Sequence, residues 1–182
     1  MPTYISMLRG INLGSHYSIR MEDLKALYKT LGFSEVRTYV QSGNVVFDAA
    51  GSDDIRIAAS IEAAIKQTYG FDVSVFLRGA RELQRLLDTN PVLRGRSEDP
   101  TKLHITFLYT LPDAAKARGL QIPANAGHDE FVVDGREVFV FCPDGYGRTK
   151  LSNAFFERKL ELPATTRNWN SVGALLNMAG ES

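Results

Sequence analysis

Apolar and polar residues in the first half of the chain follow clear strand and helix patterns. Residues 3–8 are mostly apolar and uncharged, which predicts a strand buried on both faces. Apolar residues at helical spacing over 21–31 predict a helix, and Gly32 suits the position just after its end. Alternating residues at 36–40 and 44–48, separated by a Gln-Ser-Gly turn, predict a hairpin.

A second helix and a further strand complete this half. One helical face carries Ile55, Ala58, Ile61 (or Glu62), Ile65 and Tyr69, and a glycine follows the last of them. Strict alternation over 71–77 then predicts a strand with one face toward a core. The predicted order is therefore strand, helix, strand, strand, helix, strand.

The same order of elements is predicted a second time. Residues 103–107 alternate as a strand, and Pro112 suits the first turn of a short helix. An Asp-Gly pair at 134–135 between two apolar runs is a strong hairpin signal. A helix over 151–160 and a short strand at 162–166 complete the pattern.

Strand-helix-strand-strand-helix-strand is the ferredoxin-like arrangement. We therefore expect an α+β protein with two ferredoxin-like (βαββαβ) halves, at 1–78 and 102–182, each with an antiparallel sheet. A connecting helix and linker at 79–101 would join the halves, and a C-terminal helix capped by Asn168 would close the second. The expected core includes Leu24, Leu27, Ile65, Val75, Phe107, Val138, Phe155 and Trp169.

Charge and cysteine content restrict the class of protein. Lys+Arg and Asp+Glu both total 21, so the formal net charge is zero, which argues against a general duplex-DNA binder. The single cysteine, Cys142, excludes an internal disulfide framework and suits a reducing compartment. No secretion signal and no apolar run of membrane length is present. We expect a cytoplasmic protein with no membrane association.

Two loop regions in the first half carry polar residues suited to binding. The first strand is followed by Arg9 and Asn12, which are flanked by glycines that let a ligand or another backbone approach closely. The first hairpin carries Arg37, Ser42 and Asn44. Ser, Gly and Asn are also ordinary turn residues, and a buried Arg can simply tie loops together, so a structural role is equally open.

A glycine-rich turn at 145–150 precedes a helix in the second half and carries Arg148 and Lys150. Free backbone N–H groups at a helix start, with added positive charge, favour an anion. The turn fits neither a P-loop nor a dinucleotide fingerprint, and a solvated turn is the plainer interpretation. Arg167 stands near the start of the last helix, where a cation is disfavoured unless an anion is close.

The sequence offers no sign of a metal, a cofactor or a catalytic group. His16, His104 and His128 lack the spacing of metal ligands, and Cys142 has no neighbouring Cys or His. Ser42 is not in a nucleophile elbow. Whether the protein is an enzyme stays open, and we expect no cofactor and no metal.

Four sequence motifs resemble the bacterial domain of unknown function 1697 family. They are Arg-Gly-Ile-Asn-Leu-Gly at 9–14, Arg-Thr-Tyr through Ser-Gly-Asn to Phe at 37–47, the run from Gly-Tyr-Gly-Arg to Arg-Lys-Leu at 145–160, and Thr-Thr-Arg-Asn-Trp-Asn at 165–170. The Ser-His pair at 15–16 departs from the family pattern. The resemblance implies a soluble bacterial protein with a fold of this kind, and it implies no activity.

Our leading hypothesis is a binding module for a phosphorylated or otherwise anionic small ligand, such as a nucleotide. The ligand would lie in a cleft between the halves, because several donors must converge to hold a small anion. One alternative is an RNA-binding protein by analogy of fold. Another is an enzyme acting on a phosphorylated or carbonyl substrate, with Arg and Asn as oxyanion-type hydrogen-bond donors. The last is a structural or partner-binding protein without a ligand. The candidate ligand-binding residues are Arg9, Asn12, Arg37, Ser42, Asn44, Arg148, Lys150 and Arg167.

Overall fold

The computed structural model describes residues 1–180. The chain forms two compact units. Among the described residues, unit 1 comprises Met1–Leu86 and residues 174–180, and unit 2 comprises Leu87–Gly173.

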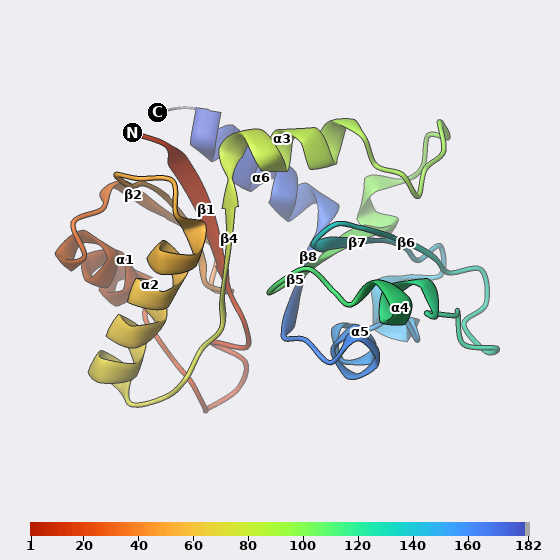
Figure 1. The fold of residues 1–182 in the computed structure, drawn as a ribbon, viewed down its shortest axis with the longest axis horizontal. Coiled ribbons are helices and arrows are strands. Elements are labelled where there is room, and N and C mark those ends of the chain that lie inside the picture. The colour runs from red at the N-terminus through yellow and green to blue at the C-terminus, as the bar shows by residue number, and fades with distance from the viewer. Residues whose placement is uncertain (181–182) are drawn as a thin grey trace. The chain divides into compact units, whose positions relative to one another are not determined.

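The sheet of unit 1 has four strands, which Figure 1 shows in red to yellow-green. They are β1 (Thr3–Leu8), β2 (Ser34–Tyr39), β3 (Asn44–Asp48) and β4 (Val75–Gly79). Their order across the sheet is β2-β3-β1-β4, and every neighbouring pair is antiparallel. The central strand β1 is therefore hydrogen-bonded on both edges.

Two helices cover one face of this sheet. The apolar stripes of α1 (Met21–Thr30) and α2 (Asp54–Tyr69) pack in one core with alternate residues of the strands. The Asp53 side chain caps α2 by accepting a hydrogen bond from the Arg56 amide. Gly70 ends the helix in the left-handed conformation, at φ 82°.

Unit 2 repeats this topology with different residues. Its strands are β5 (Leu103–Leu108), β6 (Glu130–Asp134), β7 (Glu137–Phe141) and β8 (Ala164–Asn168), in the order β6-β7-β5-β8 and again antiparallel. The helices of this unit are α4 (Ala114–Arg118) and α5 (Asn153–Leu160), which pack with one face of the sheet in a single core. Short 3₁₀ turns lie at Pro100–Lys102 and Tyr146–Arg148.

Two further helices lie outside these repeats. Helix α3 (Ala80–Asp88) follows β4 directly. Helix α6 (Trp169–Gly180) follows β8, and the Asn168 side chain caps it by accepting a hydrogen bond from the Ser171 amide at 2.8 Å. Residues from Ala174 onward belong to unit 1.

The architecture confirms the predicted fold class, because both sheets have the ferredoxin-like strand order and both predicted hairpins are present. Six of the eight predicted core residues are buried. The other two, Leu27 and Trp169, are partly buried, and Leu27 packs against the core of unit 1. Pro112 precedes α4 rather than opening it, because Asp113 is the residue that caps that helix.

Both sheets are also buried on their second face, which is opposite the face covered by the paired helices. In unit 1 this face carries Ile5, Met7 and Phe76, each at most 1% exposed. In unit 2 it carries Ile105 and Phe139, both at 0%. The prediction that β1 is buried on both faces is therefore confirmed.

Candidate functional site

Asn12 uses its whole side chain to fix the 9–14 loop. Its backbone is left-handed, at φ 57°, a conformation that Asn tolerates better than most residues. Its Nδ2 donates to the carbonyls of Ile19 at 2.9 Å and Gln41 at 2.8 Å, and its Oδ1 accepts from the Ile19 amide at 2.8 Å. Asn12 therefore ties the loop both to the start of α1 and to the β2–β3 turn.

Gly43 allows the 41–44 turn to pack directly against that loop. Its φ is 76°, and a Cβ at this position would lie 2.7 Å from Ile11 Cδ1 and 2.8 Å from Leu8 Cβ. The Leu8 amide also donates to the Gly43 carbonyl at 3.0 Å. The first two motifs thus form one packed structure, which we call the loop lock, made of the 9–14 loop and the 41–44 turn.

Ser42 and Asn44 also make contacts within the turn. Asn44 is fully buried, and its Nδ2 donates to Ser42 Oγ at 2.8 Å. Arg9 is exposed, while its amide donates to the Ser74 carbonyl at 3.1 Å. Arg37 is partly buried on β2 and pairs with Val46, so it lies on the sheet face away from α1 and α2.

In unit 2 the 145–150 turn is held by its backbone and by Thr149. Gly145 has φ 97°, its amide donates to the Cys142 carbonyl, and its own carbonyl accepts from the Arg148 amide. The Thr149 hydroxyl donates to Asp129 at 2.5 Å and accepts from the Leu151 amide at 2.9 Å. These bonds fix the path of the chain without using the two cationic side chains of the turn.

Arg148 and Lys150 are both exposed at this turn. Within residues 1–180, neither side chain makes an ion pair or a hydrogen bond. The nearby carboxylate of Asp129 is buried and bonded to Thr149. The turn therefore presents two cations to solvent, two residues apart.

Asn153, the first residue of α5, connects this helix to β8. Its Nδ2 donates to the Ala164 carbonyl at 2.9 Å, and its Oδ1 accepts from the Thr166 hydroxyl at 3.0 Å. A further hydrogen bond of 2.8 Å joins the hydroxyls of Thr166 and Thr106. The third and fourth motifs are thus joined by side-chain hydrogen bonds, as the first two are.

Arg167 lies on the opposite face of β8. It pairs with Ile105 in the sheet, and burial lowers the pKa of its guanidinium to about 10. Its Nη1 donates to Thr165 Oγ at 2.7 Å and to the Thr166 carbonyl at 3.0 Å. The group is still protonated at neutral pH, because its pKa stays well above 7.

Behind the 145–150 turn, the ring of His104 stacks on Tyr146, with 4.1 Å between ring centroids. His104 is 9% exposed, and its Nδ1 has no hydrogen-bond partner within residues 1–180. Burial lowers the pKa of His104, although the Lys102 carbonyl acts in the opposite direction. Burial also raises the pKa of the Cys142 thiol to about 11, which makes it a poor nucleophile.

The eight predicted site residues are divided between the units. Arg148, Lys150 and Arg167 lie in unit 2 and the other five in unit 1, so a shared cleft stays a prediction. Two cavities, of about 450 and 530 Å³, are lined by other residues. Sequence reasoning missed Asn153 and His104, although Asn153 stands inside a motif, directly after the helix-capping Ser152.

Two kinds of site are absent from the described part of the chain. Across residues 1–180, no three or more His, Cys, Asp and Glu side chains gather as metal ligands would. No helix within the same residues combines the length and the apolar character that crossing a membrane requires.

Comparison with known proteins gives a family and a fold. The fold is similar to that of the conserved bacterial protein SP0830 from Streptococcus pneumoniae, with a TM-score of 0.74, 21% sequence identity and coverage of 98% of each chain. No curated protein matches. The sequence model of a family described as "Protein of unknown function (DUF1697)" matches residues 1–139, well over half of the chain. The chain therefore belongs to the DUF1697 family.

Proposed function

We propose that this protein binds a small phosphorylated ligand, such as a nucleotide, through the 145–150 turn of unit 2. The observation that carries the proposal is the pair of exposed cations, Arg148 and Lys150, which have no carboxylate partner within residues 1–180. Hydrogen bonds from Arg or Lys to a phosphate are charge-assisted and about twice as strong as neutral ones. The pair is therefore suited to hold one phosphate group.

The rigidity of the turn supports the proposal. The positive φ of Gly145 sets the backbone at the start of the turn, and the Thr149–Asp129 hydrogen bond holds the residue between the two cations. A fixed backbone reduces the conformational entropy that binding would otherwise cost, although the long side chains still have to be ordered. Tyr146, which belongs to the same turn, is held by stacking of its ring on His104.

The other predicted ligand-binding residues have different roles in this proposal. Asn12 and Asn44 are bonded to neighbouring loop groups, so we assign them to shaping the loop lock. Arg9 is exposed in unit 1, and its part in ligand binding stays a prediction. Arg167 is partly buried and adds positive charge to unit 2, whereas Arg37 is partly buried in unit 1, so its part in binding also stays a prediction.

Two alternatives are less well supported. RNA-recognition sheets stack bases on aromatic side chains of an open sheet face, whereas here the faces that carry Phe76 and Phe139 are buried. A purely structural protein would account for the loop lock and would leave Arg148 and Lys150 as solvated charges, so it predicts no phosphate binding at the turn.

The experiment is a calorimetric titration of AMP and of inorganic phosphate into wild type and two double variants. Arg148→Gln/Lys150→Gln removes the proposed contacts. Arg158→Gln/Lys159→Gln removes the same charge from exposed residues of α5 and is the matched control. We expect saturable binding by wild type and by the control, and about tenfold weaker binding by the first variant, since two exposed charge contacts are lost. No binding by wild type, or equal binding by all three proteins, would refute the proposal.

A further inference from the structure

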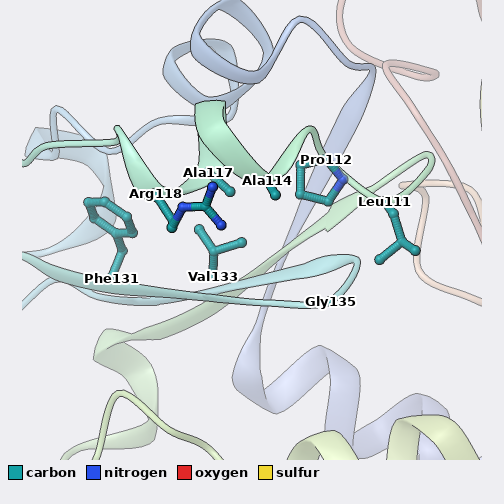
Figure 2. Close-up of a pocket in the computed structure, with 8 residues that line it drawn as sticks. All are labelled: Leu111, Pro112, Ala114, Ala117, Arg118, Phe131, Val133 and Gly135. Carbon is teal, nitrogen blue, oxygen red and sulfur yellow. The ribbon is translucent and has the colours of Figure 1, made fainter.

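A groove in unit 2 has the character of a small-molecule site. It lies between α4 and the β6–β7 hairpin, has a volume of about 450 Å³, and is shown in Figure 2. We call it the α4–β6 groove. Its lining includes Ala114 and Ala117 from α4, Phe131 and Val133 from β6, and Leu111 at one end. The volume falls within the range of about 300 to 1,000 Å³ that is common for ligand pockets.

The apolar residues of the groove follow from the strand period. Phe131 and Val133 are two positions apart, so both point to the same face of β6. Both are only partly buried, because β6 is the edge strand of its sheet. Leu111 is 69% exposed. A ligand with an apolar body would remove this surface from water, which is favourable in proportion to the area covered.

Arg118 is the one cation among the residues that line this groove, and it is exposed. Helix α4 is fixed to the end of α5 by the ion pair of Lys116 with Glu161. Arg118 is two residues further along the helix, about 200° around its axis, so it leaves the helix on another side. Figure 2 shows its side chain in the groove, between α4 and Val133.

The charge of Arg118 is not balanced by a neighbouring acid. Within the described residues 1–180, its side chain makes no ion pair and no hydrogen bond. The acids directly next to lining residues are Asp113, whose carboxylate caps α4, Glu130, which is paired with Arg96, and Asp134, which is exposed on the hairpin. The groove therefore combines apolar walls with a single positive charge.

We propose that the α4–β6 groove binds a small amphipathic carboxylate, with an apolar body on Phe131 and Val133 and its carboxylate on Arg118. A planar guanidinium matches a carboxylate through two parallel hydrogen bonds. One cation and apolar walls suit a monoanion with a hydrophobic body better than a phosphate, which is more highly charged and strongly hydrated. This site is separate from the 145–150 turn, and the proposal does not depend on the proposed function.

The test uses naphthalene-2-carboxylate as the anionic probe and naphthalene-2-methanol as its neutral counterpart. Each is titrated into the full chain, with binding followed by calorimetry and located by amide chemical shifts. Arg118→Gln removes the charge, while Arg158→Gln makes the same change on an exposed residue of α5. Phe131→Ala serves as a second variant that removes an apolar wall and keeps the charge.

We expect wild type and Arg158→Gln to bind the carboxylate equally and to bind it more tightly than the alcohol. Arg118→Gln should bind the carboxylate about fivefold more weakly and the alcohol unchanged, since only the charge-assisted contact is lost. Phe131→Ala should weaken both probes. The proposal is overturned if wild type shows no saturable binding, if Arg118→Gln leaves carboxylate binding unchanged, or if the shifts lie outside α4 and β6.

Discussion

The loop lock of unit 1 and the 145–150 turn of unit 2 look alike in sequence and differ in how their polar side chains are used. Both combine glycines with arginine and an amide or hydroxyl side chain. In the loop lock, Asn12 and Asn44 donate to neighbouring loop groups, and Gly43 is packed against Leu8 and Ile11. At the turn, Arg148 and Lys150 are exposed, and neither has a side-chain partner within residues 1–180.

This difference separates a structural motif from a candidate site. A buried amide must have hydrogen-bond partners, so a motif whose amides are all satisfied by the chain needs no ligand to explain it. Exposed cations are solvated by water and need no partner within the chain. The two cations on this fixed turn are therefore accessible to a ligand.

The largest effect is expected for Gly43→Ala. The new Cβ would overlap Leu8 and Ile11, and its backbone would stay at a positive φ of 76°. Overpacking and left-handed strain together should lower the free energy of unfolding by about 3 kcal/mol. Urea denaturation measures it. Gly14→Ala is the control, because Gly14 also has positive φ but open space around it. Equal losses in the two variants would mean that close packing at Gly43 is unimportant.

Asn12→Ala should cost about 2 kcal/mol, because three hydrogen bonds are lost and the loop groups they satisfied have to find water. The amides of Ile19 and of the 41–44 turn should also exchange hydrogen faster. Asn12→Asp keeps the acceptor for the Ile19 amide and should lose less. If Asn12→Ala is as stable as wild type and instead loses ligand binding, the loop lock is a site.

A pH-dependent effect is expected from His104 in unit 2. Burial lowers its pKa below the ordinary 6.5, so the unfolded chain takes up a proton at a higher pH than the folded protein does. The stability that the neutral ring provides is complete above the unfolded pKa. It is lost as the pH falls through that value toward the folded pKa.

Denaturation at about pH 7.5 and about pH 5 measures this effect. His104→Phe should lose less stability than wild type over this interval, and His16→Phe, at an exposed position, should behave as wild type does. In the loop lock, Asn12 and Gly43 do not titrate, so they make no pH-dependent contribution to stability. An equal pH slope in His104→Phe and wild type would contradict this account.

The smallest change in stability is expected for Arg148→Gln/Lys150→Gln. Neither side chain has a partner within residues 1–180, so the free energy of unfolding should change by less than about 0.5 kcal/mol. Thermal denaturation checks this. A loss comparable to that of Asn12→Ala would show that the turn, too, is structural.

The fold was predictable because the relevant signals are local. Alternation, helical spacing and the two turn signals at 41–43 and 134–135 identify every strand of both repeats. Element boundaries were less predictable. The residue that caps α4 is Asp113, and the helix begins two positions after Pro112, since a capping side chain competes with the preference of proline for the first turn.

The candidate site was predictable only as a set of residue types. Nothing in the spacing of Asn12 shows that Gln41, far along the chain, would accept its hydrogen bond. The sequence shows only that His104 lacks the spacing of a metal ligand, because its stacking on Tyr146 is a contact between distant segments. Which polar groups form hydrogen bonds within the folded chain depends on the tertiary structure. The pattern of residues along the sequence does not show it.

The most direct test of the contrast is a titration of inorganic phosphate followed by the amide resonances of the whole chain. We predict that the shifts concentrate at residues 145–150 and that the amides of 9–14 and 41–44 do not move. Shifts that concentrate at the loop lock, with a silent 145–150 turn, would contradict the account.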